Sequence, residues 1–82
     1  MLSMRKVLGK NEVVECKSDE NGHVYCELKV KMKDGEMPKV AFIKAAIVKG
    51  MLQPLEVKGS EEHLDKLYNF MKKRVIPDGD RI

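Results

Sequence analysis

The sequence has no tryptophan, only two cysteines and no long run of apolar residues. Cys16 and Cys26 are too few for the disulfide framework of small secreted domains, and their spacing is not the Cys-x-x-Cys of a zinc site. The longest apolar stretch, residues 40–48, is interrupted by Lys44 and is far too short to span a bilayer. The N-terminal residues contain no apolar run of the length that a signal peptide needs. We therefore expect a cytoplasmic protein without a membrane segment.

A strong excess of charge of either sign is also missing. The chain has 16 Lys and Arg residues against 13 Asp and Glu residues, which gives a formal net charge of +3. Such a mixed surface permits nucleic-acid binding without requiring it. Hydrophobic residues make up 43% of the chain and fall into periodic segments, which is typical of a folded protein. A chain of 82 residues forms one domain, so we predict a single domain over 1–82 with frayed ends at 1–3 and 78–82.

The clearest strand is predicted from His23 to Lys33, where apolar and polar residues alternate. A weaker alternation precedes the turn signal at 19–22. Matching apolar side chains across this turn pairs Cys16 with Cys26, because a slip of one residue would turn every side chain to the other face. We expect both cysteines to be buried as free thiols on the apolar face. A cross-strand disulfide is the alternative, and a reducing cytoplasm disfavours it.

The segment from Lys39 to Lys49 is compatible with two secondary structures. We predict a helix. It is favoured by Pro38 before the segment, by Ala45 and Ala46 within it and by Gly50 after it. The alternative is a third strand starting near Lys39. It is favoured by the β-branched residues of the segment and by its three lysines, which do not share one helical face.

The rest of the chain is easier to interpret. Residues 55–58 are predicted to form a short strand, and residues 4–8 can add another. Ser60, followed by apolar residues at helical spacing, predicts a helix from Glu61 to about Val75. The predicted fold class is therefore α+β: a small, mostly antiparallel sheet, made of an N-terminal β-hairpin and a short later strand, with two helices packed on one face. The sequence carries no motif that we recognise as diagnostic of a protein family.

No group of residues in the sequence indicates catalysis or metal binding. Glu15 and Glu27 face each other in the predicted hairpin, but no second catalytic group accompanies them. The favoured interpretation is therefore that side chains of opposite charge alternate on the solvent-exposed face of the hairpin. His63 lies in the first turn of the last helix without a nucleophile beside it in the sequence. His23 lies on the opposite face of its strand from Cys26, which leaves no ligand set for zinc. We expect no enzymatic activity, no cofactor and no metal site.

A basic stripe is predicted on the wet face of the long strand. Lys29, Lys31 and Lys33 share that face with Tyr25, and such a face can follow a phosphate backbone and stack one base. The lysines of the segment 39–49 would extend the stripe if that segment lay alongside. Nucleic-acid-binding sheets usually show more than one exposed ring and a stronger charge. Nucleic-acid binding is therefore the second hypothesis.

Several apolar side chains fall outside the helical stripes. Four of them are assigned to an interface: Phe42, Val48, Leu52 and Phe70. A second copy of the chain or a protein partner would cover this surplus. Alternatively, the middle segment is sandwiched between the sheet and the last helix. The leading hypothesis is a non-catalytic interaction module, of a regulatory or phage type, that binds a protein partner or itself.

Overall fold

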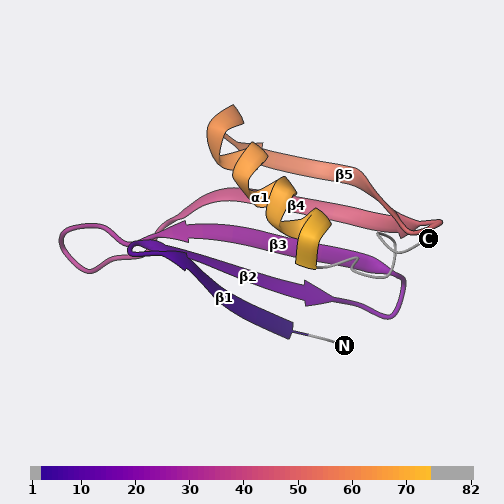
Figure 1. Cartoon of the computed structure of the whole chain (residues 1–82), viewed down its shortest axis with the longest axis horizontal. Helices are drawn as coiled ribbons and strands as arrows, with labels where there is room; N and C mark the ends of the chain where they lie inside the picture. The colour runs from indigo at the N-terminus through magenta and orange to yellow at the C-terminus, as the bar shows by residue number, and fades with distance from the viewer. Residues whose placement is uncertain (1–2, 75–82) are drawn as a thin grey trace.

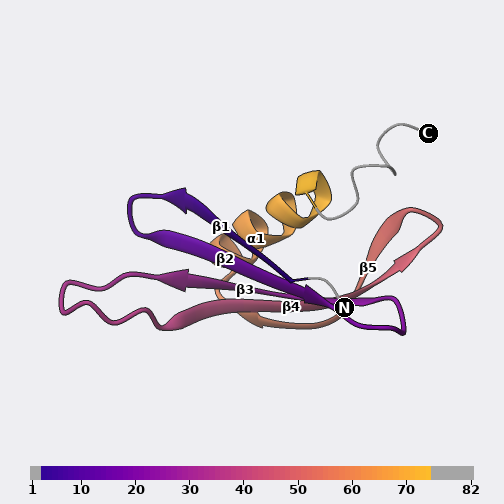
Figure 2. The ribbon, with the colours of Figure 1, turned by 90° about the horizontal axis from the view of Figure 1, so that it is seen from below.

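The computed structural model describes residues 3–74, which form one five-stranded antiparallel sheet and one helix (Figure 1). Each strand pairs with the next strand in the chain, so the sheet is a meander. The helix lies across one face of the sheet, and no described residue covers the other face in the same way (Figure 2). The elements are β1 (Ser3–Gly9), β2 (Glu12–Ser18), β3 (His23–Val30), β4 (Lys39–Val48), β5 (Met51–Gly59) and α1 (Glu61–Arg74).

The hairpin of β2 and β3 has the predicted register, with Cys16 opposite Cys26. Gly22 in its turn has a φ of 81°, a left-handed conformation that glycine adopts without strain. The additional strand predicted at residues 4–8 is present as β1. The predicted end of the long strand at Lys33 is wrong, because β3 ends at Val30. Beyond it, the N–H of Lys31 donates to the carbonyl oxygen of Asn11 in the β1–β2 turn over 2.7 Å.

The helix predicted from Lys39 to Lys49 is wrong, because this segment is strand β4. It pairs with β3 on one side and β5 on the other, and alternate residues along it are buried. Its β-branched residues favour this pleated, half-buried environment. Gly50 has a φ of 76° and Lys49 a φ of 54°, so these residues form a two-residue hairpin turn rather than a helix cap. The fold is therefore a five-stranded antiparallel sheet with one C-terminal helix, instead of a small sheet with two helices.

Strand β5 forms one edge of the sheet and extends the short strand predicted at 55–58 in both directions. A β-bulge interrupts its pairing between Lys44 and Ala45 of β4. Gly59, its last residue, has a φ of 131°, and a Cβ atom there would lie 2.6 Å from the carbonyl oxygen of Val40. Only glycine permits this close approach of β5 to β4 before the chain turns into the helix.

The helix begins at the predicted position. The N–H of His63 donates to Ser60 Oγ over 3.4 Å, so Ser60 acts as the N-cap. The predicted apolar stripe is only partly correct, because Phe70, which was placed outside it, is 8% exposed and packs in the core. The buried residues of the helix are Leu67, Phe70 and Met71.

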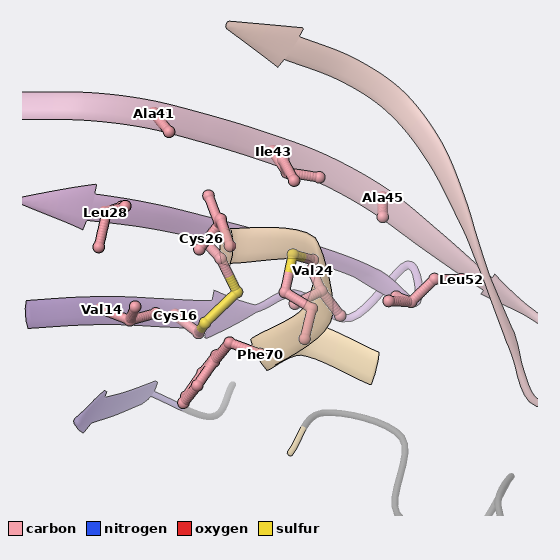
Figure 3. Packing of buried hydrophobic residues seen from close by; sticks show 12 residues of the cluster. Val14, Cys16, Val24, Cys26, Leu28, Ala41, Ile43, Ala45, Leu52 and Phe70 are labelled. Carbon is pink, nitrogen blue, oxygen red and sulfur yellow. A yellow bond between two sulfur atoms is a disulfide. The ribbon is translucent and has the colours of Figure 1, made fainter. Parts of the chain in front are cut away.

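The core lies between the helix and one face of the sheet, and Figure 3 shows how its side chains converge there. Helix α1 contacts β3, β4 and β5 most extensively. The sheet contributes short or branched side chains, which let the helix approach closely. The core residues of the sheet are Val14, Cys16, Val24, Cys26, Leu28, Ala41, Ile43, Ala45 and Leu52.

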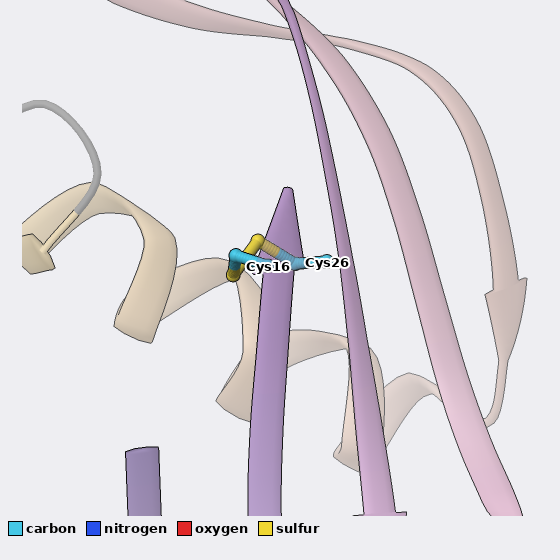
Figure 4. Close-up of a disulfide and its surroundings, with 2 residues drawn as sticks. All are labelled: Cys16 and Cys26. Carbon is cyan, nitrogen blue, oxygen red and sulfur yellow. A yellow bond between two sulfur atoms is a disulfide. The ribbon is translucent and has the colours of Figure 1, made fainter. Parts of the chain in front are cut away.

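Cys16 and Cys26 are buried as predicted, but they are not free thiols. The two residues are joined by a disulfide within the core (Figure 4). Their Cα atoms lie 4.1 Å apart, close to the spacing of about 4.5 Å that is typical of narrow antiparallel pairs. The predicted register therefore placed the sulfur atoms within bonding distance, and the free-thiol interpretation is wrong.

The ends predicted to fray lie outside the described residues, except for Ser3, the first residue of β1. Within residues 3–74, no helix is long and apolar enough to cross a membrane. The cytoplasmic location stays a prediction.

Candidate functional site

The sheet face opposite the helix, which we call the open face, carries most of the candidate functional residues. Because side chains alternate along each strand, the strand register decides which of them share this face. Basic side chains outnumber acidic ones on it. The basic residues are Arg5, Lys17, Lys29, Lys39, Lys44 and Lys58, and the acidic residues are Glu15, Glu27 and Glu56.

Two aromatic rings lie next to each other at the centre of the open face. Tyr25 of β3 pairs with Lys44 of β4, and Phe42 lies two residues before Lys44, so the two rings are diagonal neighbours. Both side chains are half-buried. Both also line two adjoining hollows of the open face, of about 520 and 360 Å³. The face therefore has two adjacent aromatic surfaces at the edges of shallow depressions.

The ring of Tyr25 is held in place by Asp19 in the β2–β3 turn. The hydroxyl of Tyr25 donates to Asp19 Oδ2 over 2.9 Å. Asp19 Oδ1 accepts the backbone N–H groups of Asn21 and His23 over 2.9 and 3.0 Å. The N–H of His23, together with these other donors, lowers the pKa of Asp19 below its ordinary value. The hydrogen bond to Asp19 in turn raises the pKa of Tyr25 above its ordinary value.

Each ring has a lysine ammonium group nearby. Lys44 Nζ lies 5.5 Å from the centre of the Tyr25 ring, and Lys39 Nζ lies 6.0 Å from the centre of the Phe42 ring. These distances are at or within the range of cation–π attraction. Each ammonium group therefore lies over the face of a ring, and a flat ligand that stacks on the same face would displace it toward the ligand's edge.

Two carboxylates hold some of the lysines in ion pairs. Glu15 accepts a hydrogen bond from Lys29, which lowers the pKa of Glu15 and raises that of Lys29. Glu27 lies 2.9 Å from Lys39 Nζ and 3.5 Å from Lys29 Nζ. All four side chains are accessible to solvent, so these pairs are weak and exchange readily with another anion.

The structure brings together only part of the predicted nucleic-acid site. Tyr25 and Lys29 share the open face, whereas Lys31 and Lys33 lie beyond the end of β3 in the exposed connection to β4. Lys39 and Lys44 take their place beside the rings. Phe42 was not predicted on this face, because its segment was predicted to be a helix. In a strand, alternate side chains point to the same face, and this places Phe42 on the open face.

The four residues assigned to an interface do not form one surface. Leu52 and Phe70 are each 8% exposed and belong to the core. Phe42 is half-buried on the open face, and Val48 is 45% exposed near the β4–β5 turn. Half of the predicted apolar surplus is therefore absorbed by the single core of this domain.

Other candidate groups do not add chemistry to the open face. Glu15 and Glu27 are opposite each other as predicted, and both form ion pairs with Lys29. His63 Nδ1 lies 2.9 Å from Ser60 Oγ, which belongs to the cap of the helix. Within residues 3–74, no three His, Cys, Asp or Glu side chains are grouped so that they could hold a metal ion.

No family model, curated protein or solved structure matches this chain.

Proposed function

We propose that this protein binds single-stranded nucleic acid on the open face, with bases stacking on Tyr25 and Phe42 and phosphates contacting the surrounding lysines. The observation that carries the proposal is the pair of adjacent rings, each with a lysine ammonium group 5.5–6.0 Å from its centre. An open sheet face with two stacking rings and basic side chains is a recurrent way of binding single strands.

A single strand differs from a duplex in the base surfaces that it exposes. Unpaired bases offer both of their flat surfaces for stacking, whereas a duplex hides them between neighbouring base pairs. Stacking on an aromatic side chain contributes about 1–3 kcal/mol for each base. Tyr25 is well suited to this role, because its hydrogen bond to Asp19 fixes the ring before a base arrives.

The phosphates would replace carboxylates as partners of the lysines. Lys29 and Lys39 are held by Glu15 and Glu27 in partly exposed ion pairs, which cost little to break. Lys17 and Lys44 form no ion pair among the described residues. A base that stacks on Tyr25 would displace the Lys44 ammonium group from the ring, and this group could then contact the phosphate. Such contacts release counterions, so the affinity should fall as the salt concentration rises.

The first experiment measures binding of a fluorescent oligothymidylate by anisotropy at several salt concentrations. We expect Phe42→Ala and Tyr25→Ala each to weaken binding by about 10-fold or more, since each removes one stacking surface. Tyr68→Ala is the matched control, because Tyr68 lies on the helix, away from the open face. Circular dichroism establishes that each variant is folded.

A second variant tests the charge contribution. Lys39→Gln combined with Lys44→Gln should reduce the slope of log affinity against log salt by about 1.4, because each lost phosphate contact contributes about 0.7 for a single strand. A wild-type protein that binds no oligonucleotide at low salt would overturn the proposal. Equal affinity for the single strand and its duplex would rule out stacking on the rings.

The leading hypothesis from the sequence was an interaction module that binds a protein partner or itself, and a different observation favours the second form, self-association. Ile47, Val48 and Met51 are 38%, 45% and 69% exposed around the β4–β5 turn. A second copy of the chain would remove these side chains from water. Light scattering tests this: the wild type should be a dimer and Val48→Lys a monomer, and a monomeric wild type would reject the hypothesis.

A further inference from the structure

A second group of basic side chains lies on the other side of the sheet, at the edge formed by β1. Arg5 and Lys6 are consecutive residues of this edge strand, so their side chains point to opposite faces. Arg5 is paired with Glu15 on the open face, whereas Lys6 is paired with Val14 on the face that the helix covers. The same edge therefore has a cation on each side.

On the helix side, Lys6 lines a hollow of about 280 Å³ between β1 and the C-terminal half of α1. Among residues 3–74, no acidic side chain lines it. Its lining residues are Lys6, Leu8, Lys66, Asn69, Phe70, Lys73 and Arg74. The ammonium group of Lys66 lies 2.7 Å from a carboxylate oxygen of Glu12, but Lys6, Lys73 and Arg74 form no ion pair within residues 3–74.

The helix dipole explains only part of this arrangement. Cations in the last turn of a helix are stabilised by its negative end, which accounts for Lys73 and Arg74. It does not account for Lys6, which lies on a strand and faces the same hollow. Three like charges around one depression repel one another, and an anion between them would remove that repulsion.

We propose that a single strand bound on the open face continues over the β1 edge, and that its next phosphates bind in the hollow lined by Lys6, Lys73 and Arg74. This inference rests on the proposed function. Arg5 and Lys17 would guide the backbone to the edge on the open side, and Lys6 would receive it on the other side. Phosphate oxygens accept charge-assisted hydrogen bonds from ammonium and guanidinium groups, and Arg74 can bind two oxygens at once.

The dimensions of the sheet make a length test feasible. Four inter-strand spacings of about 4.8 Å give a five-stranded sheet a width of about 19 Å. A short strand of about 4 nucleotides can be held by the open face alone, whereas a strand of about 16 nucleotides is long enough to pass around the edge.

The experiment compares these two oligonucleotides with the wild type and with a Lys73→Gln, Arg74→Gln variant. For the long strand, the variant should reduce the salt slope by about 1.4, since two phosphate contacts are lost. For the short strand, the slope should stay unchanged. Lys72→Gln is the matched control: it removes one charge from the same helical turn, but its ammonium group lies 5.2 Å from the ring of Tyr68 instead of lining the hollow.

The possible outcomes separate this inference from the proposed function. If the wild type binds neither oligonucleotide, both ideas are rejected together. If both bind and the variant has the same salt slope as the wild type for the long strand, only the continuation over the edge is rejected. If two short strands bind to each protein and the variant loses one of them, the hollow binds a second strand, which also overturns the proposed path. A Lys6→Gln variant, on a different element, should repeat the loss for the long strand.

Discussion

Asp19 determines the position of the aromatic ring that the proposed function needs. Its two carboxylate oxygens accept hydrogen bonds from the turn backbone on one side and from the phenol of Tyr25 on the other. Because the folded protein lowers the pKa of Asp19, this carboxylate stabilises the fold above its unfolded pKa of about 3.9. That contribution is lost as the pH falls through the lower, folded pKa.

The phenol of Tyr25 offers a direct measurement of this contact. In a Tyr68→Phe background, Tyr25 is the only tyrosine, and the absorbance of its phenolate can be followed with pH. Asp19→Ala should move the titration to lower pH, toward the ordinary value of about 10, because the raised pKa depends first on the hydrogen bond to Asp19. Glu20→Ala is the control, and an Asp19→Ala titration that coincides with it would contradict the assignment.

Gly59 is the residue at which the backbone leaves least room for a side chain. Ala at this position would combine a left-handed φ of 131° with a Cβ atom 2.6 Å from the Val40 carbonyl oxygen. Gly22→Ala is a matched control, because Gly22 also has a positive φ but a Cβ atom there would have no neighbouring atom within 4 Å. We expect Gly22→Ala to destabilise by about 1 kcal/mol and Gly59→Ala by at least about 1 kcal/mol more. Urea unfolding measures both, and equal losses would show that β5 can move away from β4.

At the scale of elements, the hairpin of β2 and β3 is closed by the disulfide between Cys16 and Cys26, which are separated by 10 residues. A loop of this size should contribute about 2–3 kcal/mol by restricting the unfolded chain. Reductant should therefore lower the thermal midpoint by about 10–20 °C. A Cys16→Ala, Cys26→Ala variant should not respond to reductant. A wild-type midpoint that ignores reductant, together with two titratable thiols in the native protein, would contradict the disulfide.

Strand β4 shows where the sequence could not decide between two elements. Ala45, Ala46 and Gly50 are typical of a helix and its end, and they compete with β-branched residues of opposite preference. The choice depends on pairing with β3 and β5, which are distant contacts that local propensities do not contain. In contrast, the hairpin register and the start of α1 were predictable, because alternation and a Ser60 cap are local signals.

The incorrect element also concealed the candidate site. With a helix at 39–49, Tyr25 is the only ring on the wet face of the sheet. As a strand, the same segment brings Phe42, Lys39 and Lys44 beside Tyr25 on the open face. The cysteines show a related limit, because their pairing followed from the register while their oxidation state did not. Each of these side chains could be identified in the sequence, but which of them lie next to one another depends on the order and pairing of the strands.

At the scale of the whole molecule, the open face combines basic residues with carboxylates that partly neutralise them. Glu27 is central, since it lies opposite Phe42 and contacts both Lys29 and Lys39. Glu27→Gln should strengthen oligonucleotide binding by about 2- to 5-fold at low salt, because it frees both lysines and removes a negative charge from the path of the backbone. Glu36→Gln, in the connection between β3 and β4, should change affinity much less. Weaker binding by Glu27→Gln would indicate that the carboxylate contacts the ligand.

The position of α1 after all five strands has a consequence for how the molecule is made. A ribosome adds about 5–20 residues per second, so residues 60–74 are synthesised over roughly 1–3 s after the last residue of β5. Every strand can find its partner within the sheet before α1 exists, but the apolar face that holds Leu28 and Ile43 has no cover until α1 packs on it. The order of the elements therefore makes this face the last part of the molecule to leave water, and the part most open to non-specific association before the helix docks.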